Sequence, residues 1–112
     1  MGGADVCVTM DVIEHIPTEK ENIFMQTIYN NLVPSGFAVI GTPNVTMFPH
    51  ASEFNRVAHI NNYDQLRLYE LASKYFEQVF IFGMNDEIVN TGFYPMSCYI
   101  IALCCQKKTN GE

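Results

Sequence analysis

The chain has 112 residues, twelve acidic against six basic side chains, a net charge of −6 and 48% hydrophobic residues. That length and hydrophobic content suit one compact domain, residues 1–112, with a core of its own. The acidic balance, with no basic stripe along the sequence, argues against nucleic acid as a partner. No apolar run approaches the roughly 20 residues that span a bilayer, so we expect no membrane partner.

The four cysteines are spaced too irregularly for a metal or redox motif. Cys7, Cys98, Cys104 and Cys105 lie in apolar runs, and none belongs to a C-x-x-C pair. We expect no secretory signal peptide before them. We therefore expect reduced thiols and a cytoplasmic protein, because paired cysteines are rare inside cells.

A short apolar run near the start predicts the first strand and the candidate site. Residues Val6 to Met10 are apolar and β-branched in part, and an aspartate stands on each side of them. Asp11, Glu14 and His15 follow directly. In open parallel sheets, ligands bind outside the carboxyl ends of the strands. Two carboxylates and an imidazole at such an end make this the strongest candidate site.

A helix is predicted next, over about residues 19–32. Thr18 to Glu21 has the pattern of a capping box, in which the glutamate reaches back to the start of the helix. Helical spacing predicts that one face packs on the sheet and the other meets water. The predicted sheet-facing residues are Ile23, Phe24, Ile28 and Leu32, and the predicted water-facing residues are Lys20, Asn22, Gln26 and Asn30.

The following turn and second strand complete a βαβ unit. Pro34 ends the helix, Ser35 and Gly36 turn the chain, and Gly36 is expected at a positive φ angle. Residues 37–41 are apolar on both faces, as in an interior parallel strand. Parallel pairing would place Thr42 to Asn44 at the same edge as Asp11, where we expect turn-stabilising roles for Thr42 and Asn44.

The rest of the chain predicts a loop, a helix and two strands. Residues 45–62 are expected to form a long loop, followed by a helix to about residue 76 with Leu68, Leu71, Ala72 and Tyr75 on its buried face. Strands are expected at 79–83 and 96–106, paired antiparallel because a loop joins them. The predicted fold class is α/β. It is a partial Rossmann-like sheet of about four strands, with helices on its faces and an antiparallel C-terminal hairpin.

Three segments together resemble the class I S-adenosylmethionine (SAM) dependent methyltransferases, and most of all the ubiquinone-type O-methyltransferases. They are Asp11-Val-Ile-Glu-His-Ile16, Leu32-Val-Pro-Ser-Gly36 and the strand that ends in Thr42-Pro-Asn44. Asp11 stands where the family has a glutamate, and Ser35 where it has a glycine. The resemblance covers nearly the whole chain but only the C-terminal half of the family's fold.

This resemblance implies methyl transfer from SAM to an oxygen of a small molecule. By family analogy Met10 and Asp11 lie near the cofactor, and His15 and His59 are candidate bases. Tyr63, Tyr94 and Tyr99 could line a pocket or simply pack. The glycine-rich turn that holds SAM in the family is absent from this chain. It is therefore open whether the chain binds SAM alone.

Some relatives in the resembling family hold a divalent cation at this place. Asp11, Glu14, His15 and His59 are the corresponding candidates here, with His50 as a further one, and oxygen and imidazole ligands suit magnesium or manganese. The alternative is a solvated acidic edge with a neighbouring histidine.

Because half of the family's fold is missing, two further interpretations of the chain's function remain open. The chain could be a non-catalytic remnant or interaction module that dimerises, or one half of a split enzyme that needs a partner chain. The strand at residues 6–10 is central in the family, and here it would lie at an edge. We therefore expect a homodimer or a missing N-terminal half to cover it.

Overall fold

The computed structural model describes residues 3–44, 61–85, 88–91 and 97–109. In chain order the elements are β1 (Ala4–Met10), η1 (Ile13–His15), η2 (Thr18–Lys20), α1 (Glu21–Asn31), β2 (Leu32–Pro43), α3 (Gln65–Ser73), β3 (Phe76–Asn85), β4 (Ile88–Asn90) and β5 (Tyr99–Lys107). This is an α/β fold with a partial Rossmann-like sheet, which confirms the predicted fold class. No helix among these elements is long and apolar enough to cross a membrane.

The sheet has the strand order β1-β2-β5-β3-β4. The β1 and β2 strands pair in parallel, as predicted for a βαβ unit. The last long strand, β5, lies between β2 and β3 and is antiparallel to both. The predicted C-terminal hairpin is therefore confirmed, with its last strand inserted into the sheet. The three-residue β4, which pairs with the end of β3, was not predicted.

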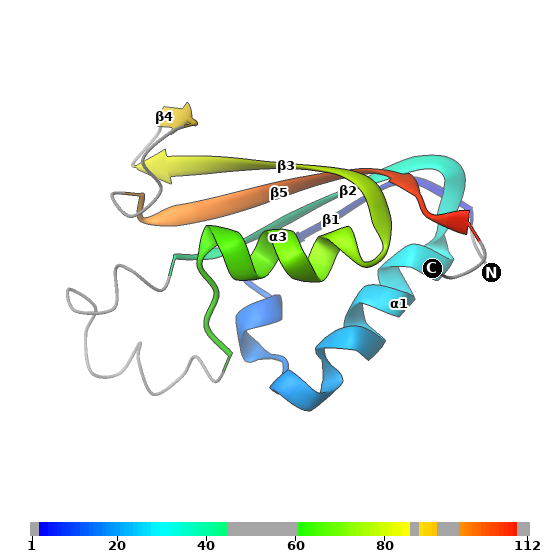
Figure 1. Ribbon diagram of the computed structural model, residues 1–112, viewed down its shortest axis with the longest axis horizontal. Coiled ribbons are helices and arrows are strands. Elements are labelled where there is room, and N and C mark those ends of the chain that lie inside the picture. The colour runs from blue at the N-terminus through cyan, green and yellow to red at the C-terminus, as the bar shows by residue number, and fades with distance from the viewer. Residues whose placement is uncertain (1–2, 45–60, 86–87, 92–96, 110–112) are drawn as a thin grey trace.

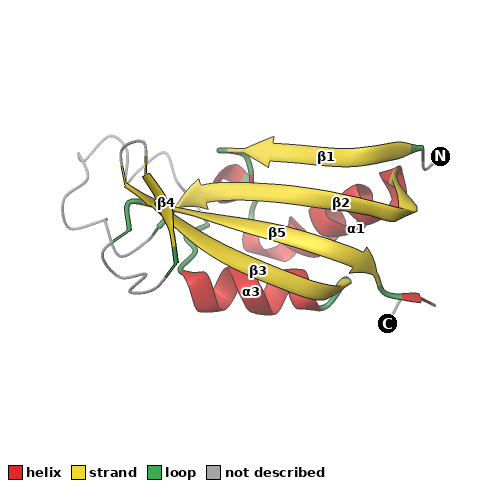
Figure 2. Cartoon of the chain, turned by 90° about the horizontal axis from the view of Figure 1, so that it is seen from above, coloured by secondary structure: helices red, strands yellow, loops and turns green. Residues whose placement is uncertain are grey.

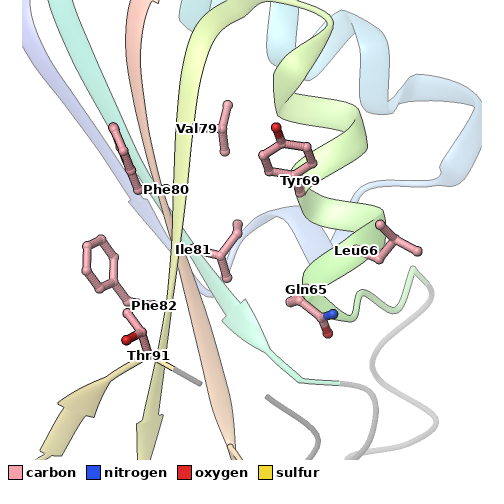
Figure 3. A pocket seen from close by; sticks show the side chains of 8 residues that line it. All are labelled: Gln65, Leu66, Tyr69, Val79, Phe80, Ile81, Phe82 and Thr91. Atoms are coloured by element: carbon pink, nitrogen blue, oxygen red, sulfur yellow. The ribbon is translucent and has the colours of Figure 1, made fainter. Parts of the chain in front are cut away.

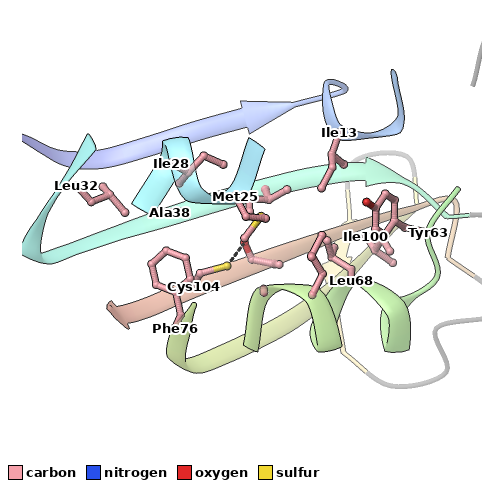
Figure 4. Packing of buried hydrophobic residues seen from close by; sticks show 14 residues of the cluster. Ile13, Met25, Ile28, Leu32, Ala38, Tyr63, Leu68, Phe76, Ile100 and Cys104 are labelled. Atoms are coloured by element: carbon pink, nitrogen blue, oxygen red, sulfur yellow. Dashed lines mark hydrogen bonds between the residues drawn. The ribbon is translucent and has the colours of Figure 1, made fainter. Parts of the chain in front are cut away.

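Both α-helices of the described chain lie on one side of the sheet. Figure 1 shows α1 and α3 below the strands, and Figure 2 shows the opposite side of the sheet with the helices behind it. Between the helices and the sheet lies the hydrophobic core, drawn in Figure 4. The core consists of Ile13, Met25, Ile28, Leu32, Ala38, Ile40, Tyr63, Leu68, Leu71, Ala72, Phe76, Ile100, Ala102 and Cys104.

The other side of the sheet is apolar as well. Residues opposite one another in the ladders share a face. The registers therefore assign the following residues to the face away from the core: Val6, Val8, Met10, Phe37, Val39, Gly41, Pro43, Gln78, Phe80, Phe82, Met84, Tyr99, Ile101, Leu103 and Cys105. We call these residues the open face. Five of them are large apolar residues at least 38% exposed: Val6, Val8, Met10, Phe37 and Phe80.

Helix α1 differs from its sequence prediction in where it starts and in one buried position. It begins at Glu21, and no side chain caps it. The predicted capping box at Thr18 is therefore wrong, because the Glu21 carboxylate bonds elsewhere. Met25 and Ile28 are buried, whereas Ile23 is 65% exposed. Ile23 points away from the core because Met25, two positions later, takes the sheet-facing place. The four predicted water-facing residues are exposed.

Gly36 is needed for a close approach of two backbones. The β1–β2 register shifts between the pairs Ala4–Leu32 and Val6–Phe37, so β2 carries an irregularity at the predicted turn. A Cβ atom on Gly36 would lie 2.9 Å from the carbonyl oxygen of Asp5. The predicted positive φ angle of Gly36 is wrong, because its φ lies outside the left-handed region. Among the described non-glycine residues, Asp11 and Gln106 have positive φ angles.

Helix α3 follows its sequence prediction closely. Leu68, Leu71 and Ala72 are buried, and Tyr75 is half-buried. Asp64 is the N-cap, and its carboxylate accepts a hydrogen bond from the Arg67 backbone N–H at 2.9 Å. This bond satisfies one of the free amide groups at the start of a helix.

Candidate functional site

Asp11 stands directly at the carboxyl end of β1. Its backbone has a φ angle of 61°, in the left-handed region that aspartate tolerates better than most residues. Its N–H donates to the Gly41 carbonyl at 3.0 Å, so pairing with β2 continues one residue past the strand. The Tyr99 hydroxyl donates to Asp11 Oδ1 at 2.9 Å. Asp11 is exposed, and these two bonds fix both its backbone and its carboxylate.

Tyr99 reaches Asp11 because Gly41 leaves room for it. A Cβ atom on Gly41 would lie 2.7 Å from the Met10 side chain and 2.8 Å from the Tyr99 ring. Burial, followed by the hydrogen bond to Asp11 and the charge of that carboxylate, raises the pKa of the Tyr99 phenol. Tyr99 therefore remains a neutral donor over the physiological range.

Glu14 is a buried carboxylate within the short helix η1. It is 2% exposed, and its Oε1 accepts a hydrogen bond from the Thr42 hydroxyl at 2.8 Å. The Glu14 carbonyl accepts from the Asn61 N–H at 3.0 Å. A buried carboxylate needs such partners, because an unpaired one is costly to remove from water. Glu14 therefore joins η1 to the end of β2 and to the segment before α3.

His15 lies beside Glu14 but on the outside. Its Nε2 is 3.7 Å from Glu14 Oε2, and its side chain is 48% exposed. Thr42 holds Glu14, and the Glu14 carboxylate lies within ion-pair distance of the exposed imidazole, although 3.7 Å is too long for a hydrogen bond. Such a group can take a proton from a substrate if its ring faces that substrate.

Asn44 supports the same edge of the sheet. It is fully buried, its side-chain amide donates to the Ser97 carbonyl at 3.0 Å, and its N–H donates to the Cys98 carbonyl at 3.0 Å. It also forms a parallel bridge with Tyr63. Asn44 therefore holds the end of β2 to the segment before β5, and Thr42 holds Glu14, so the contacts of both residues are long-range rather than those of the local turn that was expected.

A second polar cluster lies behind this edge and was missed by sequence reasoning. Oε1 of Glu21 accepts hydrogen bonds from the Tyr63 hydroxyl at 2.5 Å, from the Asn61 amide at 3.1 Å and from Arg67 at 3.0 Å. The Arg67 guanidinium also stacks 4.0 Å from the centre of the Tyr63 ring. The cluster joins the start of α1 to residues 61–67. In the sequence, Glu21 stands in the pattern of a capping box, and that pattern does not indicate its contacts with residues 61–67.

The charge state of this cluster follows from its contacts. Burial alone would raise the pKa of Glu21, but the hydrogen bonds from Tyr63 and Asn61 and the charge of Arg67 outweigh it and lower that pKa. Burial and the bond to Glu21 raise the pKa of Tyr63. Glu21 is therefore an anion and Tyr63 a neutral donor at neutral pH.

The predicted site residues are partly brought together. Met10, Asp11, Glu14 and His15 all lie at the end of β1, whereas His59 and His50 lie outside the described residues. The described part of the chain contains no group of three or more side chains placed to hold a metal ion. Asp11 and Glu14 point to different partners, Tyr99 and Thr42. None of the four cysteines is paired in a disulfide in the structure.

The structure also has a hollow beside β3, three strands away from β1 in the sheet. A cavity of about 410 Å³ lies beside β3 and is lined by Gln65, Leu66, Tyr69, Val79, Phe80, Ile81, Phe82 and Thr91 (Figure 3). This lining contains no carboxylate, imidazole or thiol. Because it lacks groups for acid–base chemistry, we place the candidate site at the end of β1 instead.

Comparison with solved structures identifies the fold as that of SAM-dependent methyltransferases. A SAM-dependent methyltransferase from Thermotoga maritima matches with a TM-score of 0.72 and 15% identity, over 92% of this chain and 56% of its own. The methyltransferase domain of bacterial CtHen1-C matches at 0.70 and 15%, over 96% and 54%. The small RNA methyltransferase HEN1 matches at 0.68 and 18%, over 94% and 14%.

These matches cover almost all of this chain but much less of each solved protein. The chain spans slightly more than half of the Thermotoga protein and of the CtHen1-C domain. No protein-family profile matches the chain, and no curated protein sequence matches it either. The comparisons therefore establish a methyltransferase fold of which this chain forms a part.

Proposed function

We propose that the chain forms the C-terminal half of a class I SAM-dependent methyltransferase, with its side of the active site at the end of β1. The observation that carries this proposal is the position of Asp11, Glu14 and His15. They gather at the carboxyl end of a parallel strand in a sheet of methyltransferase fold. In open α/β sheets this is the edge where ligands bind.

The described residues fit SAM as one wall of a site. SAM supplies a methyl group on a positively charged sulfur. The Asp11 carboxylate, held by Tyr99, can accept hydrogen bonds from amino or hydroxyl groups of the cofactor. Met10 lies next to it on the same rim. No glycine-rich turn is present in the sequence to form a second wall. We therefore expect weak binding by the chain alone.

The acceptor that we propose is an oxygen atom of a small molecule, as in the O-methyltransferases that the sequence resembles. In this proposal His15 removes the acceptor's proton, and the buried Glu14 orients the imidazole while Thr42 holds Glu14. An acceptor hydroxyl loses a proton when it is methylated, so a base beside it lowers the barrier. The proposal includes a cytoplasmic location, which rests on the free thiols.

A divalent cation at this edge stays a prediction. The bonds from Tyr99 and Thr42 each occupy one carboxylate oxygen, and the described residues include no group of three or more side chains placed to hold an ion. The experiment below therefore includes magnesium as a separate condition.

The proposal is tested by following backbone amide signals while S-adenosylhomocysteine is added, with and without magnesium. We expect weak saturable shifts, with a dissociation constant on the order of 1 mM, at Met10, Asp11 and their neighbours in β2. Asp11→Asn should weaken them. Asp5→Asn changes an exposed aspartate at the opposite end of β1 and should have no effect.

Two results would contradict the proposal. One is the absence of any shift at the end of β1 at millimolar ligand. The other is an equal response of the two variants, because it would show that the ligand does not recognise the Asp11 edge.

A further inference from the structure

The short helix η1, which carries His15, depends on the rest of the chain for its position. Its backbone hydrogen bonds run from the His15 N–H to the Val12 carbonyl at 2.9 Å and from the Ile16 N–H to the Ile13 carbonyl at 3.1 Å. A 3₁₀ turn of three residues has poor hydrogen-bond geometry and holds its shape weakly by itself. Contacts from other elements therefore set where His15 lies.

One such contact fixes the peptide group that joins Glu14 to His15. The Asn61 N–H donates to the carbonyl of this peptide at 3.0 Å, and the N–H of the same peptide donates to Val12. A peptide group is planar. Hydrogen bonds on both sides of the plane therefore fix its orientation, and with it the direction in which the chain enters His15.

Asn61 is itself held by its side chain. The side-chain amide donates to Glu21 Oε1 at 3.1 Å and to the Tyr63 hydroxyl at 3.0 Å. Asn61 is 3% exposed and Tyr63 is fully buried, while the Glu21 side chain is 14% exposed. Hydrogen bonds that are shielded from water are strong and leave few alternative arrangements. Asn61 therefore connects Glu21 to η1, through its side chain on one side and its backbone on the other.

A second connection reaches the same edge of the sheet. Tyr63, which donates to Glu21, forms a parallel bridge with Asn44 after the end of β2. Thr42, two residues before Asn44, holds the Glu14 carboxylate. The carbonyl and the carboxylate of Glu14 are thus both tied to one framework of buried polar groups. That framework begins at Glu21, outside the candidate site.

We propose that Asn61 and Glu21 are positioning residues for His15, the base of the proposed function. Glu21 holds the Asn61 side chain, and Asn61 holds the peptide between Glu14 and His15. The inference rests on the proposed function, because it concerns the same base. A buried charged group adds little net stability compared with apolar packing of the same volume, so the fixing of one geometry explains Glu21 better.

The test follows the NMR signals of the isotope-labelled full chain. Glu21→Ala removes an acceptor of the Asn61 amide. We expect amide exchange at Asn61 to become at least about tenfold faster, and the carbonyl signal of Glu14 and the ring signals of His15 to shift. Asn61→Ala keeps the backbone N–H but loses the side chain, and it should shift the same signals. It also provides the comparison if Glu21→Ala does not fold.

The conservative variant and a matched control separate positioning from general stability. Glu21→Gln keeps an oxygen that accepts from Asn61, so the His15 signals should stay as in the wild type even though the lost charge lowers stability. Asp64→Ala removes the N-cap bond to the Arg67 N–H in the same segment and leaves the Asn61 contacts in place. It should lower stability without moving the His15 signals.

Three results would overturn the inference. One is that Asn61→Ala leaves the Glu14 and His15 signals unchanged. Another is an equal response of His15 to Asp64→Ala, because the segment would then act only through its stability. The third is a shift with Glu21→Gln as large as with Glu21→Ala.

The positioning and the proposed function can fail separately. His15 signals that respond as expected, in a chain whose Asp11 edge does not bind S-adenosylhomocysteine, would contradict the function and support the positioning. Binding of S-adenosylhomocysteine at Asp11, with His15 signals that no variant moves, would do the reverse.

Discussion

At the scale of single residues, the candidate site is built from contacts that bridge long stretches of sequence. Asp11 meets Tyr99 across 88 positions, and Glu14 meets Thr42 across 28. The sequence could locate Asp11, Glu14 and His15, because they are neighbours after one strand. It could not assign their partners, since Tyr99 and Thr42 reach them only through the pairing of β1, β2 and β5. For the same reason, the sequence pattern predicts a capping role for Glu21 and not its contacts with Tyr63, Asn61 and Arg67.

Glu21 should make the stability of the chain depend on pH. Its pKa in the folded chain is below the ordinary value of 4.5, so its contribution is present above about pH 4.5 and is lost as the pH falls through the lower folded pKa. Glu21→Gln should cost about 1–3 kcal/mol at pH 7, because three donors lose a charged acceptor. Urea unfolding at several pH values measures this.

The expected signature is a difference between wild type and Glu21→Gln that shrinks as the solution is acidified below pH 4.5. Glu19→Gln, an exposed glutamate two residues earlier, is the control and should change little. A difference that stays constant from pH 7 to acid would show that the charge of Glu21 does not contribute.

At the scale of elements, local sequence signals predicted the features that depend on neighbouring residues alone. Asp64 caps α3, and its buried face follows the predicted spacing of Leu68, Leu71 and Ala72. The antiparallel C-terminal pair followed from the loop that joins its strands. The three-residue β4 was missed, because so short a strand has no period to detect. The apolar strands were expected to be buried on both faces, and nothing in their pattern indicated that the helices would cover only one.

Gly36 should be intolerant of any side chain where β2 departs from its register with β1. A Cβ atom there would meet the Asp5 carbonyl at 2.9 Å and the Val33 carbonyl at 3.1 Å, and neither backbone atom can rotate away. Gly36→Ala should therefore cost about 1–3 kcal/mol in unfolding free energy. Gly3→Ala is the control, since nothing lies within 4 Å of its Cβ position, and its effect should stay within about 0.5 kcal/mol.

Urea unfolding of the two variants provides the measurement. Equal midpoints for Gly36→Ala and Gly3→Ala would show that β1 and β2 can separate at this point without loss of stability.

At the scale of the whole molecule, the two faces of the sheet differ. The helices α1 and α3 cover one face, and the open face exposes apolar side chains. The isolated chain should bind an environment-sensitive hydrophobic dye on its open face. Val8→Lys should reduce the dye fluorescence several-fold, because it places a charge in the middle of that face. Ile23→Lys changes a residue of similar exposure on α1 and should leave the fluorescence unchanged. Equal losses in both variants would place the dye elsewhere.

The position of β5 has a consequence for how the protein is made. It is the last strand in the sequence, yet it lies in the middle of the sheet, between β2 and β3. During synthesis the facing edges of those two strands cannot join until residues 99–107 have left the ribosome. Contacts this distant in sequence slow folding, because the intervening chain must first be ordered. We therefore expect the sheet to form from two separate parts, with its centre the last place to close.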